Sequence, residues 1–197
     1  MDFGEPFGGL MPGARGAVLA VLLRTGAPLT GRRVHAMVAD RHSLGSVQQA
    51  LRDLERLGLI TTETVGRAGV HRVSEAHVAI GPLRDLVSPI EMLTRVVREA
   101  VQGVESVIVF GSVARGDARA ESDIDLAVIA SAEWEGRADL QQQVHERLGN
   151  DCDVLHLTPD QFELDPGERE PVAAEILRDG IALVGRMPSL RRRHCVN

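Results

Sequence analysis

Two consecutive segments decide the fold of this chain: Val107-Ile108-Val109-Phe110-Gly111-Ser112-Val113-Ala114-Arg115-Gly116-Asp117 and Ser122-Asp123-Ile124-Asp125-Leu126-Ala127-Val128-Ile129. The first is an apolar run of strand length that stops at Gly-Ser, and the second opens with two aspartates spaced i, i+2. Because side chains alternate faces along a strand, Asp123 and Asp125 are expected to point the same way while Ile124 points into the core. Two neighbouring carboxylates repel each other unless a cation lies between them, and oxygen ligands suit Mg²⁺ or Mn²⁺. The pattern therefore predicts a divalent-metal site.

The Gly-Ser step between the two strands has the features of a phosphate site. Gly111 lets the backbone approach a ligand closely, and Ser112 with the following amides forms a phosphate cradle if a helix starts there. Gly-Ser alone would be typical of an ordinary turn, and Asp-x-Asp alone of a solvated strand edge. A phosphate site beside a metal site is the apparatus of phosphoryl or nucleotidyl transfer, so the combination favours that chemistry.

The combined pattern, read over residues 110–117 and 122–126, resembles the nucleotidyltransferase superfamily of the DNA polymerase β type. The resemblance implies a minimal nucleotidyltransferase domain that binds an NTP, with ATP expected, and Mg²⁺ or Mn²⁺ as cofactor. It implies a third carboxylate at the start of a later strand, where Asp153 fits better than Asp151 because an apolar run continues directly from it. Relatives of this kind pair with separate helical partner proteins. The predicted site therefore consists of catalytic and metal-binding Asp123, Asp125 and Asp153, with nucleotide-binding Gly111, Ser112 and Arg115.

The N-terminal half carries a second pattern, of three helices followed by a hairpin. An apolar helix begins at Ala14 and stops at Gly26, Thr30 is a candidate N-cap for a helix over 31–38, and Ser43 introduces a third helix. In that third helix Val47, Leu51, Leu54 and Leu57 form one apolar stripe. Residues 59–64 and 70–74 are predicted strands around a Gly-containing turn.

The stretch from Ser46 to Ile60 resembles the recognition helix and wing entry of bacterial winged helix-turn-helix regulators. The outer face of that helix would present DNA-binding residues to the major groove, and the wing tip would reach a phosphate or the minor groove. These candidates are Ser46, Gln48, Gln49 and Arg52 on the helix and Arg67 on the wing. The same residues could instead solvate an exposed helix, and winged helices also serve as protein-interaction modules.

Charge is distributed unevenly along the chain, whose net charge is -6. Residues 14–75 carry nine Arg against five acidic residues, and the remainder carries thirteen Arg against twenty-three acidic residues. A basic N-terminal piece joined to an acidic C-terminal piece suggests two domains with different partners. The expected partner of the basic domain is double-stranded DNA. No stretch approaches transmembrane length and the N-terminus lacks a signal-peptide pattern, so no membrane association and a cytoplasmic location are expected.

The sequence thus predicts a two-domain α/β (α+β) protein, with an N-terminal winged helix-turn-helix and a C-terminal nucleotidyltransferase fold whose short mixed sheet is flanked by helices. The predicted parts are a flexible arm (1–13), the winged helix-turn-helix domain (14–80), a linker helix (81–103), the nucleotidyltransferase domain (104–186) and a tail (187–197). The helix from Ile90 to Val101 is expected to pack on the sheet or to form a homodimer. Further predicted elements are a helix over 132–148 capped by Ser131, a strand over 151–157, a helix over 171–178 and a strand over 181–184.

The expected function is Mg-dependent transfer of NMP from an NTP to an acceptor, by a protein that also binds DNA. Either a protein acceptor or no acceptor at all is favoured, because no sizeable substrate-binding domain follows Val184. The alternative is a transcriptional regulator whose nucleotidyltransferase domain only senses nucleotide, without catalysis. A third interpretation, an enzyme that modifies a small molecule, is disfavoured by the same missing lobe. Cys152 is expected to be a buried, inert thiol, and His156 a packing residue.

Overall fold

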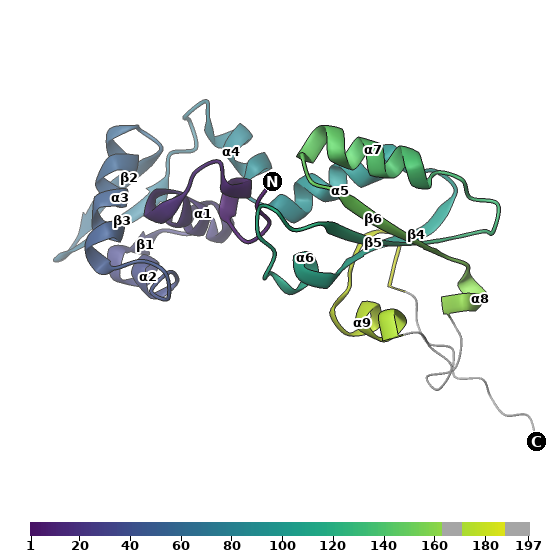
Figure 1. Cartoon of the computed structure of the whole chain (residues 1–197). Helices are drawn as coiled ribbons and strands as arrows, with labels where there is room; N and C mark the ends of the chain where they lie inside the picture. The colour runs from purple at the N-terminus through teal and green to yellow at the C-terminus, as the bar shows by residue number, and fades with distance from the viewer. Residues whose placement is uncertain (163–170, 188–197) are drawn as a thin grey trace, which may run out of the picture. The chain divides into compact units, whose positions relative to one another are not determined.

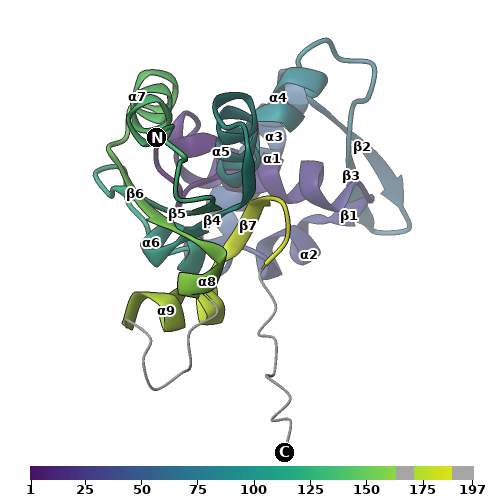
Figure 2. The same cartoon turned by 90° about the vertical axis from the view of Figure 1, so that its right-hand side faces the viewer.

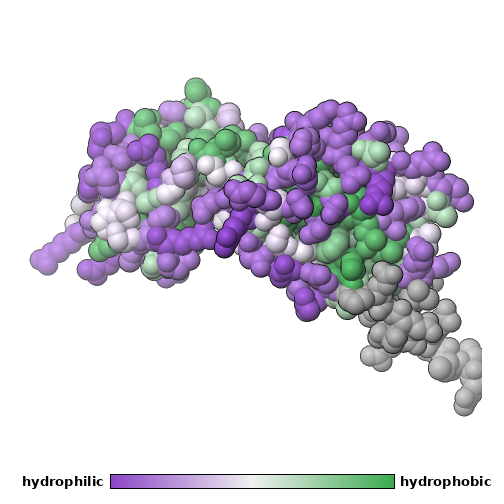
Figure 3. All heavy atoms as spheres, in the orientation of Figure 1, coloured by the Kyte–Doolittle hydropathy of each residue, from purple (hydrophilic) through white to green (hydrophobic). Residues whose placement is uncertain are grey.

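The computed structural model describes residues 1–162 and 171–187, which form two compact units (Figure 1). The N-terminal unit is Glu5–Met92, and the C-terminal unit is Met1–Gly4 together with Leu93–Asn197. No helix in the part of the chain that the structure describes is long and apolar enough to cross a membrane. Hydrophilic side chains predominate on the face shown in Figure 3, because each unit gathers its Leu, Val and Ile side chains inside.

The N-terminal unit follows the predicted order of three helices and a hairpin. Its elements are η1 (Pro6–Gly9), α1 (Gly13–Thr25), β1 (Leu29–Thr30), α2 (Gly31–Ala36), α3 (Leu44–Arg56), β2 (Ile60–Val65), β3 (Ala68–Val73) and α4 (Ile80–Leu86). The three strands form an antiparallel sheet in the order β1-β3-β2. Helix α3 packs on α1 and α2 through buried Val47, Leu51 and Leu54.

The predicted N-cap Thr30 is confirmed, and Ser43, predicted only to introduce the third helix, is the N-cap of α3. Oγ1 of Thr30 accepts a hydrogen bond from Arg33 N at 3.3 Å, and Oγ of Ser43 accepts one from Ser46 N at 3.2 Å. Such bonds satisfy amides that have no partner within the helix. Leu57, predicted in the apolar stripe, is instead 55% exposed because α3 ends at Arg56 and the chain turns away at Gly58, whose φ is 72°.

Two segments predicted to lie outside the domains are packed. In the segment 1–13, predicted as a flexible arm, Phe7 is 1% exposed in the core of the N-terminal unit, and the Met1 amine donates to Asn150 Oδ1 at 2.7 Å in the C-terminal unit. The predicted linker 81–103 contains most of α4 and all of α5 (Pro89–Ala100). Ile80 and Val87, at the two ends of α4, join the core of the N-terminal unit, since burying such side chains is favourable.

The C-terminal unit is a four-stranded mixed sheet with helices on both faces (Figures 1 and 2). Its other elements are β4 (Val104–Phe110), α6 (Gly111–Arg115), β5 (Ile124–Ala130), α7 (Arg137–Leu148), β6 (Cys152–Leu157), α8 (Pro159–Phe162), α9 (Pro171–Asp179) and β7 (Ile181–Val184). The strand order is β6-β5-β4-β7, in which β5 and β6 are parallel and the other pairs antiparallel. Both views place α5 and α7 on one face and α6, α8 and α9 on the other.

The two faces of this sheet are both apolar, which explains the continuous hydrophobic runs of β4 and β5. On the face toward α8 and α9, Ile108, Ala127 and Ile129 pack against Phe162 and Ile176. Three apolar side chains of α5, those of Leu93, Val96 and Val97, are buried inside the unit and at most 4% exposed. Of the two expectations for this helix, the structure therefore favours packing on the sheet over a homodimer made by these side chains.

Helix α7 begins at Arg137, five residues later than predicted. Trp134 N donates to Ser131 O, so residues 131–134 form a turn where a helix start with Ser131 as N-cap was predicted. The Trp134 ring packs over Gly136, where a Cβ would lie 2.9 Å from ring carbons. Glycine thus permits the turn that delays the helix. The predicted tail from 188 onward lies outside the described residues.

Candidate functional site

The predicted phosphate-binding turn lies where β4 passes directly into α6. Gly111 is buried and has a φ of 65°, in the left-handed region that glycine adopts without strain. A Cβ at this position would overlap Oδ2 of Asp125. The sequence predicted that Gly111 allows close approach to a ligand, and in the structure the group that approaches it is the Asp125 carboxylate.

The aspartates predicted as metal ligands lie at this end of the sheet. Asp125 is opposite Phe110 of β4 and in parallel register with Asp153 of β6. Residues opposite each other on adjacent strands share a face, so both carboxylates lie on the face that carries α6 and α9. Asp123 is exposed and stands one residue before β5. The structure thus brings together the β4–α6 turn and the starts of β5 and β6.

The electrostatics of the cluster centre on Asp125. Burial raises the pKa of Asp125, and the charges of Asp153, Asp123 and Glu175 raise it further, while Arg115 acts in the opposite direction. Burial and the neighbouring negative charges disfavour the ionised carboxylate of Asp125, and the positive charge of Arg115 favours it. The site therefore carries an excess of negative charge that a bound cation would relieve.

The predicted shell of three aspartates is not formed by the side chains as they stand. Among residues 1–162 and 171–187, no group of three or more His, Cys, Asp or Glu side chains is arranged to hold a metal ion. Mg²⁺, however, is usually held by one or two carboxylates and completes its six ligands with waters and substrate phosphates. Neighbouring Asp125 and Asp153 fit that mode of binding, in which phosphate oxygens supply part of the shell.

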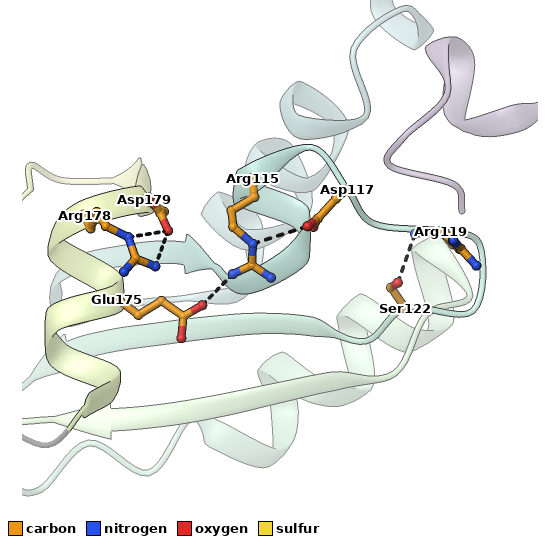
Figure 4. Close-up of polar contacts among 7 residues, drawn as sticks. All are labelled: Arg115, Asp117, Arg119, Ser122, Glu175, Arg178 and Asp179. Atoms are coloured by element: carbon orange, nitrogen blue, oxygen red, sulfur yellow. Dashed lines mark hydrogen bonds and ion pairs between the residues drawn. The ribbon is translucent and has the colours of Figure 1, made fainter. Parts of the chain in front are cut away.

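Arg115, predicted to contact nucleotide, is paired with acidic side chains (Figure 4). Its Nη1 donates to Oε1 of Glu175 at 2.5 Å, and its Nε to Oδ2 of Asp117 at 3.4 Å. Glu175 lies on α9, and sequence reasoning missed it because an acidic residue in a predicted helix resembles any solvated one. Only the packing of α9 beside α6 brings it to the site.

Asn150 is a second residue that the sequence analysis missed. It is 3% exposed, and its amide nitrogen donates to the carbonyls of Ala120 and Ser122 at 3.3 and 3.2 Å. These bonds hold the loop that leads into Asp123. The position after a helix-ending Gly149 was the available sequence signal, since a polar residue there often binds backbone groups.

Asn150→Ala is expected to lower the free energy of unfolding by about 1–3 kcal/mol, because the partly buried carbonyls that its amide satisfies would lose their partner. Urea unfolding monitored by circular dichroism measures this. The matched control is Gln142→Ala, which removes an exposed amide that donates to Glu146 within α7. Equal destabilisation by the two substitutions would contradict the role given to Asn150.

The other polar residues near β6 take the structural roles expected for them. Burial raises the pKa of the Cys152 thiol to about 12, with Asp153 and Asp125 adding to the effect, so the inert thiol is confirmed. Asp151 is 81% exposed and pairs with His145. His156 lies edge-on to the Trp134 ring and bonds to Ser131 O, at the opposite end of β6 from Asp153.

The N-terminal unit has a hollow of about 730 Å³ between α3 and the hairpin. It brings together three of the five predicted DNA-binding residues, Gln48, Arg52 and Arg67, and adds Arg32 from α2, which the sequence analysis missed. Gln49 is exposed outside it and accepts a 2.6 Å hydrogen bond from Arg52. Ser46 is half-buried and its hydroxyl donates to Ser43 O, so it serves the start of α3.

Comparison with known proteins matches residues 91–188 to the family described as polymerase beta, nucleotidyltransferase. Among solved structures, the chain is similar to a toxin–antitoxin with AMP-PNP, at 23% identity over 50% of this chain and 74% of the other (TM-score 0.38). It is also similar to the Shewanella oneidensis complex of a tri-AMPylated HEPN toxin with an MNT antitoxin, at 21% identity over 49% of this chain and 70% of the other (TM-score 0.34). A structure of the DNA recognition and protein interaction domains of HOP2 shares 25% identity over 31% of this chain and 98% of the other (TM-score 0.30). No curated protein matches the chain.

Proposed function

We propose that this chain, which carries a nucleotidyltransferase-type domain over residues 91–188, transfers a nucleoside monophosphate from an NTP, ATP in the first instance, to a protein acceptor. The observation that carries the proposal is that Asp125 and Asp153 lie in register on adjacent strands, next to the turn at Gly111. All three residues fall within the matched segment 91–188. Two adjacent carboxylates next to an abrupt strand-to-helix turn suit a nucleotide triphosphate with its metal ion.

Each residue has a proposed role in the transfer. Asp123, Asp125 and Asp153 would hold Mg²⁺ or Mn²⁺ together with phosphate oxygens, and the ion would supply neutralisation of the charge on the leaving pyrophosphate. Backbone amides after Gly111 and the Ser112 hydroxyl would bind the β- and γ-phosphates. Asp153 would take the proton of the attacking hydroxyl, whose oxygen forms the new bond to the α-phosphorus as the bond to pyrophosphate breaks.

The experiment that tests this function is incubation with ATP labelled at either the α- or the γ-phosphate, with Mg²⁺ and host-cell extract. Nucleotidyl transfer places the α-label on an acceptor and releases the γ-label as pyrophosphate. A helical partner protein is the first acceptor to examine. Calorimetric binding of Mg-ATP without transfer of either label would instead support the alternative of a regulator that only senses nucleotide.

For the N-terminal unit we propose a winged helix-turn-helix that binds double-stranded DNA. Its element order, with α3 preceding a hairpin whose turn carries Arg67, supports this proposal. Arginines on α2, α3 and the hairpin turn line one hollow, which suits a phosphate backbone, although Glu55 also lines it. His71 in the same hollow has its pKa lowered by burial, and a neutral ring adds no positive charge there.

We expect Arg52→Ala and Gln49→Ala to weaken binding to a specific duplex by about 1–3 kcal/mol where a base contact is lost. Arg67→Ala is expected to weaken binding to all sequences alike and to flatten the salt dependence, because a phosphate contact releases counterions. Selection from random duplexes followed by salt titration measures both effects. If no sequence is enriched and the variants bind like the parent, the unit is an interaction module.

A further inference from the structure

Arg115 and Glu175 join two elements of the C-terminal unit that are far apart in sequence. Arg115 is the last residue of α6, and Glu175 lies in the middle of α9. Their side chains are 38% and 33% exposed, so the pair is partly open to solvent. Figure 4 shows the guanidinium lying between Glu175 on one side and Asp117 on the other. Both partners of Arg115 are thus carboxylates of the chain itself.

The pair adjoins the carboxylates of the candidate active site. Arg115 ends α6, which packs on β5, the strand of Asp125, and Glu175 lies on α9, which packs beside α6. Arg115 also follows Gly111 and Ser112 by a single helical turn. The guanidinium therefore brings positive charge to a site that is crowded with carboxylates.

We propose that Glu175 is a further residue of the nucleotide site, which holds Arg115 and competes with the triphosphate for its guanidinium. A guanidinium binds carboxylate and phosphate oxygens through the same planar set of donors, so the two partners exclude each other at those donors. A phosphate that takes the Nη1 donor of Arg115 therefore displaces Glu175, and departure of pyrophosphate lets the ion pair form again. The proposal rests on the proposed function, because it concerns the same nucleotide.

The test is calorimetric titration of the full chain with Mg-ATP, comparing the parent with Glu175→Gln. The matched control is Asp179→Asn on the same helix. Asp179 accepts hydrogen bonds from Arg178 at 2.9 and 2.7 Å, so its substitution removes the same charge without freeing Arg115. Glu175→Gln is expected to tighten Mg-ATP binding about two- to fivefold, the range that the strength of a partly exposed ion pair allows. Asp179→Asn is expected to change it less.

Two further measurements separate competition from a general effect of charge. In an Arg115→Ala background, Glu175→Gln and Asp179→Asn should change the affinity for Mg-ATP equally, because no Arg115 guanidinium remains to be freed. Glu175→Asp keeps the charge but shortens the reach, so it should also tighten binding of Mg-ATP. Adenosine, which has no phosphates, should bind the parent and Glu175→Gln alike.

Equal affinities of Glu175→Gln and Asp179→Asn for Mg-ATP would overturn the competition and leave the proposed function standing. A gain that persists fully in the Arg115→Ala background would overturn it too. If neither the parent nor any variant binds Mg-ATP while thermal unfolding shows that all are folded, the nucleotide site itself is wrong. That result would reject the proposed function together with this inference.

Discussion

Asp125→Asn is expected to abolish Mg²⁺-dependent nucleotidyl transfer while leaving the fold intact. Asp125 is the aspartate that lies between β4 and β6, opposite Phe110 and beside Asp153. Stabilisation of transferring phosphate by a metal ion is worth several kcal/mol, and about 1.4 kcal/mol corresponds to a factor of ten in rate. The rate should therefore fall by at least about a hundredfold, measured with α-labelled ATP. Calorimetry should show weaker binding of Mg-ATP, as it should for Asp123→Asn.

The same substitution is expected to stabilise the metal-free protein at neutral pH. Burial and the neighbouring carboxylates raise the pKa of Asp125 in the folded state. Between the unfolded and the folded pKa, the folded state then binds more protons, so the free energy of unfolding falls as the pH rises through that window. Urea unfolding without divalent ions should show this loss in the parent and a smaller one in Asp125→Asn.

The control for both measurements is Asp151→Asn, which removes an exposed carboxylate two residues from Asp153. It should leave transfer, nucleotide binding and the pH dependence of stability close to those of the parent. Unchanged Mg-ATP binding in both Asp123→Asn and Asp125→Asn would contradict the metal site.

Gly111→Ala is expected to destabilise the C-terminal unit and to eliminate transfer. A non-glycine residue in left-handed backbone costs about 1–2 kcal/mol, and the φ of Gly111 is 65°. In addition, the new Cβ would overlap Oδ2 of Asp125, so either that carboxylate or the β4–α6 turn must move. Thermal unfolding and the transfer assay together measure the two consequences.

Gly116→Ala separates these two costs. Gly116 has a φ of 77° at the end of α6, but a Cβ there would meet nothing within 4 Å. It should lose only the stability that left-handed backbone costs and keep most of the transfer. If Gly111→Ala and Gly116→Ala lose stability and activity equally, then the close approach of Gly111 to Asp125 contributes nothing to transfer.

The sequence was sufficient to predict those parts of the site that are local in the chain. The strand, the turn at Gly111 and the start of β5 are encoded within about twenty residues of periodic pattern. The choice of Asp153 over Asp151 followed from the apolar run after it, and the register with Asp125 supports that choice. Whether the aspartates act on nucleotide remains a prediction.

The missed residues depend on tertiary packing that no local pattern contains. Glu175 reaches Arg115 across 60 positions, and Asn150 reaches Ala120 across 30. The start of α7 was misplaced because the Trp134 ring, packed on Gly136 and His156, outweighs the capping preference of Ser131. At such positions tertiary packing overrides the intrinsic preference of a residue for a place in a helix.

The measurement that tests the central claim most directly is the rate of α-label transfer by Asp153→Asn compared with Asp151→Asn. Both variants lose one carboxylate near the start of β6, but only Asp153 is in register with Asp125. Asp153→Asn should reduce the rate of transfer more than it weakens Mg-ATP binding, because Asp153 is proposed to take the proton of the acceptor. Asp151→Asn should transfer at the rate of the parent. The reverse ranking, or equal rates in the two variants, would contradict the account.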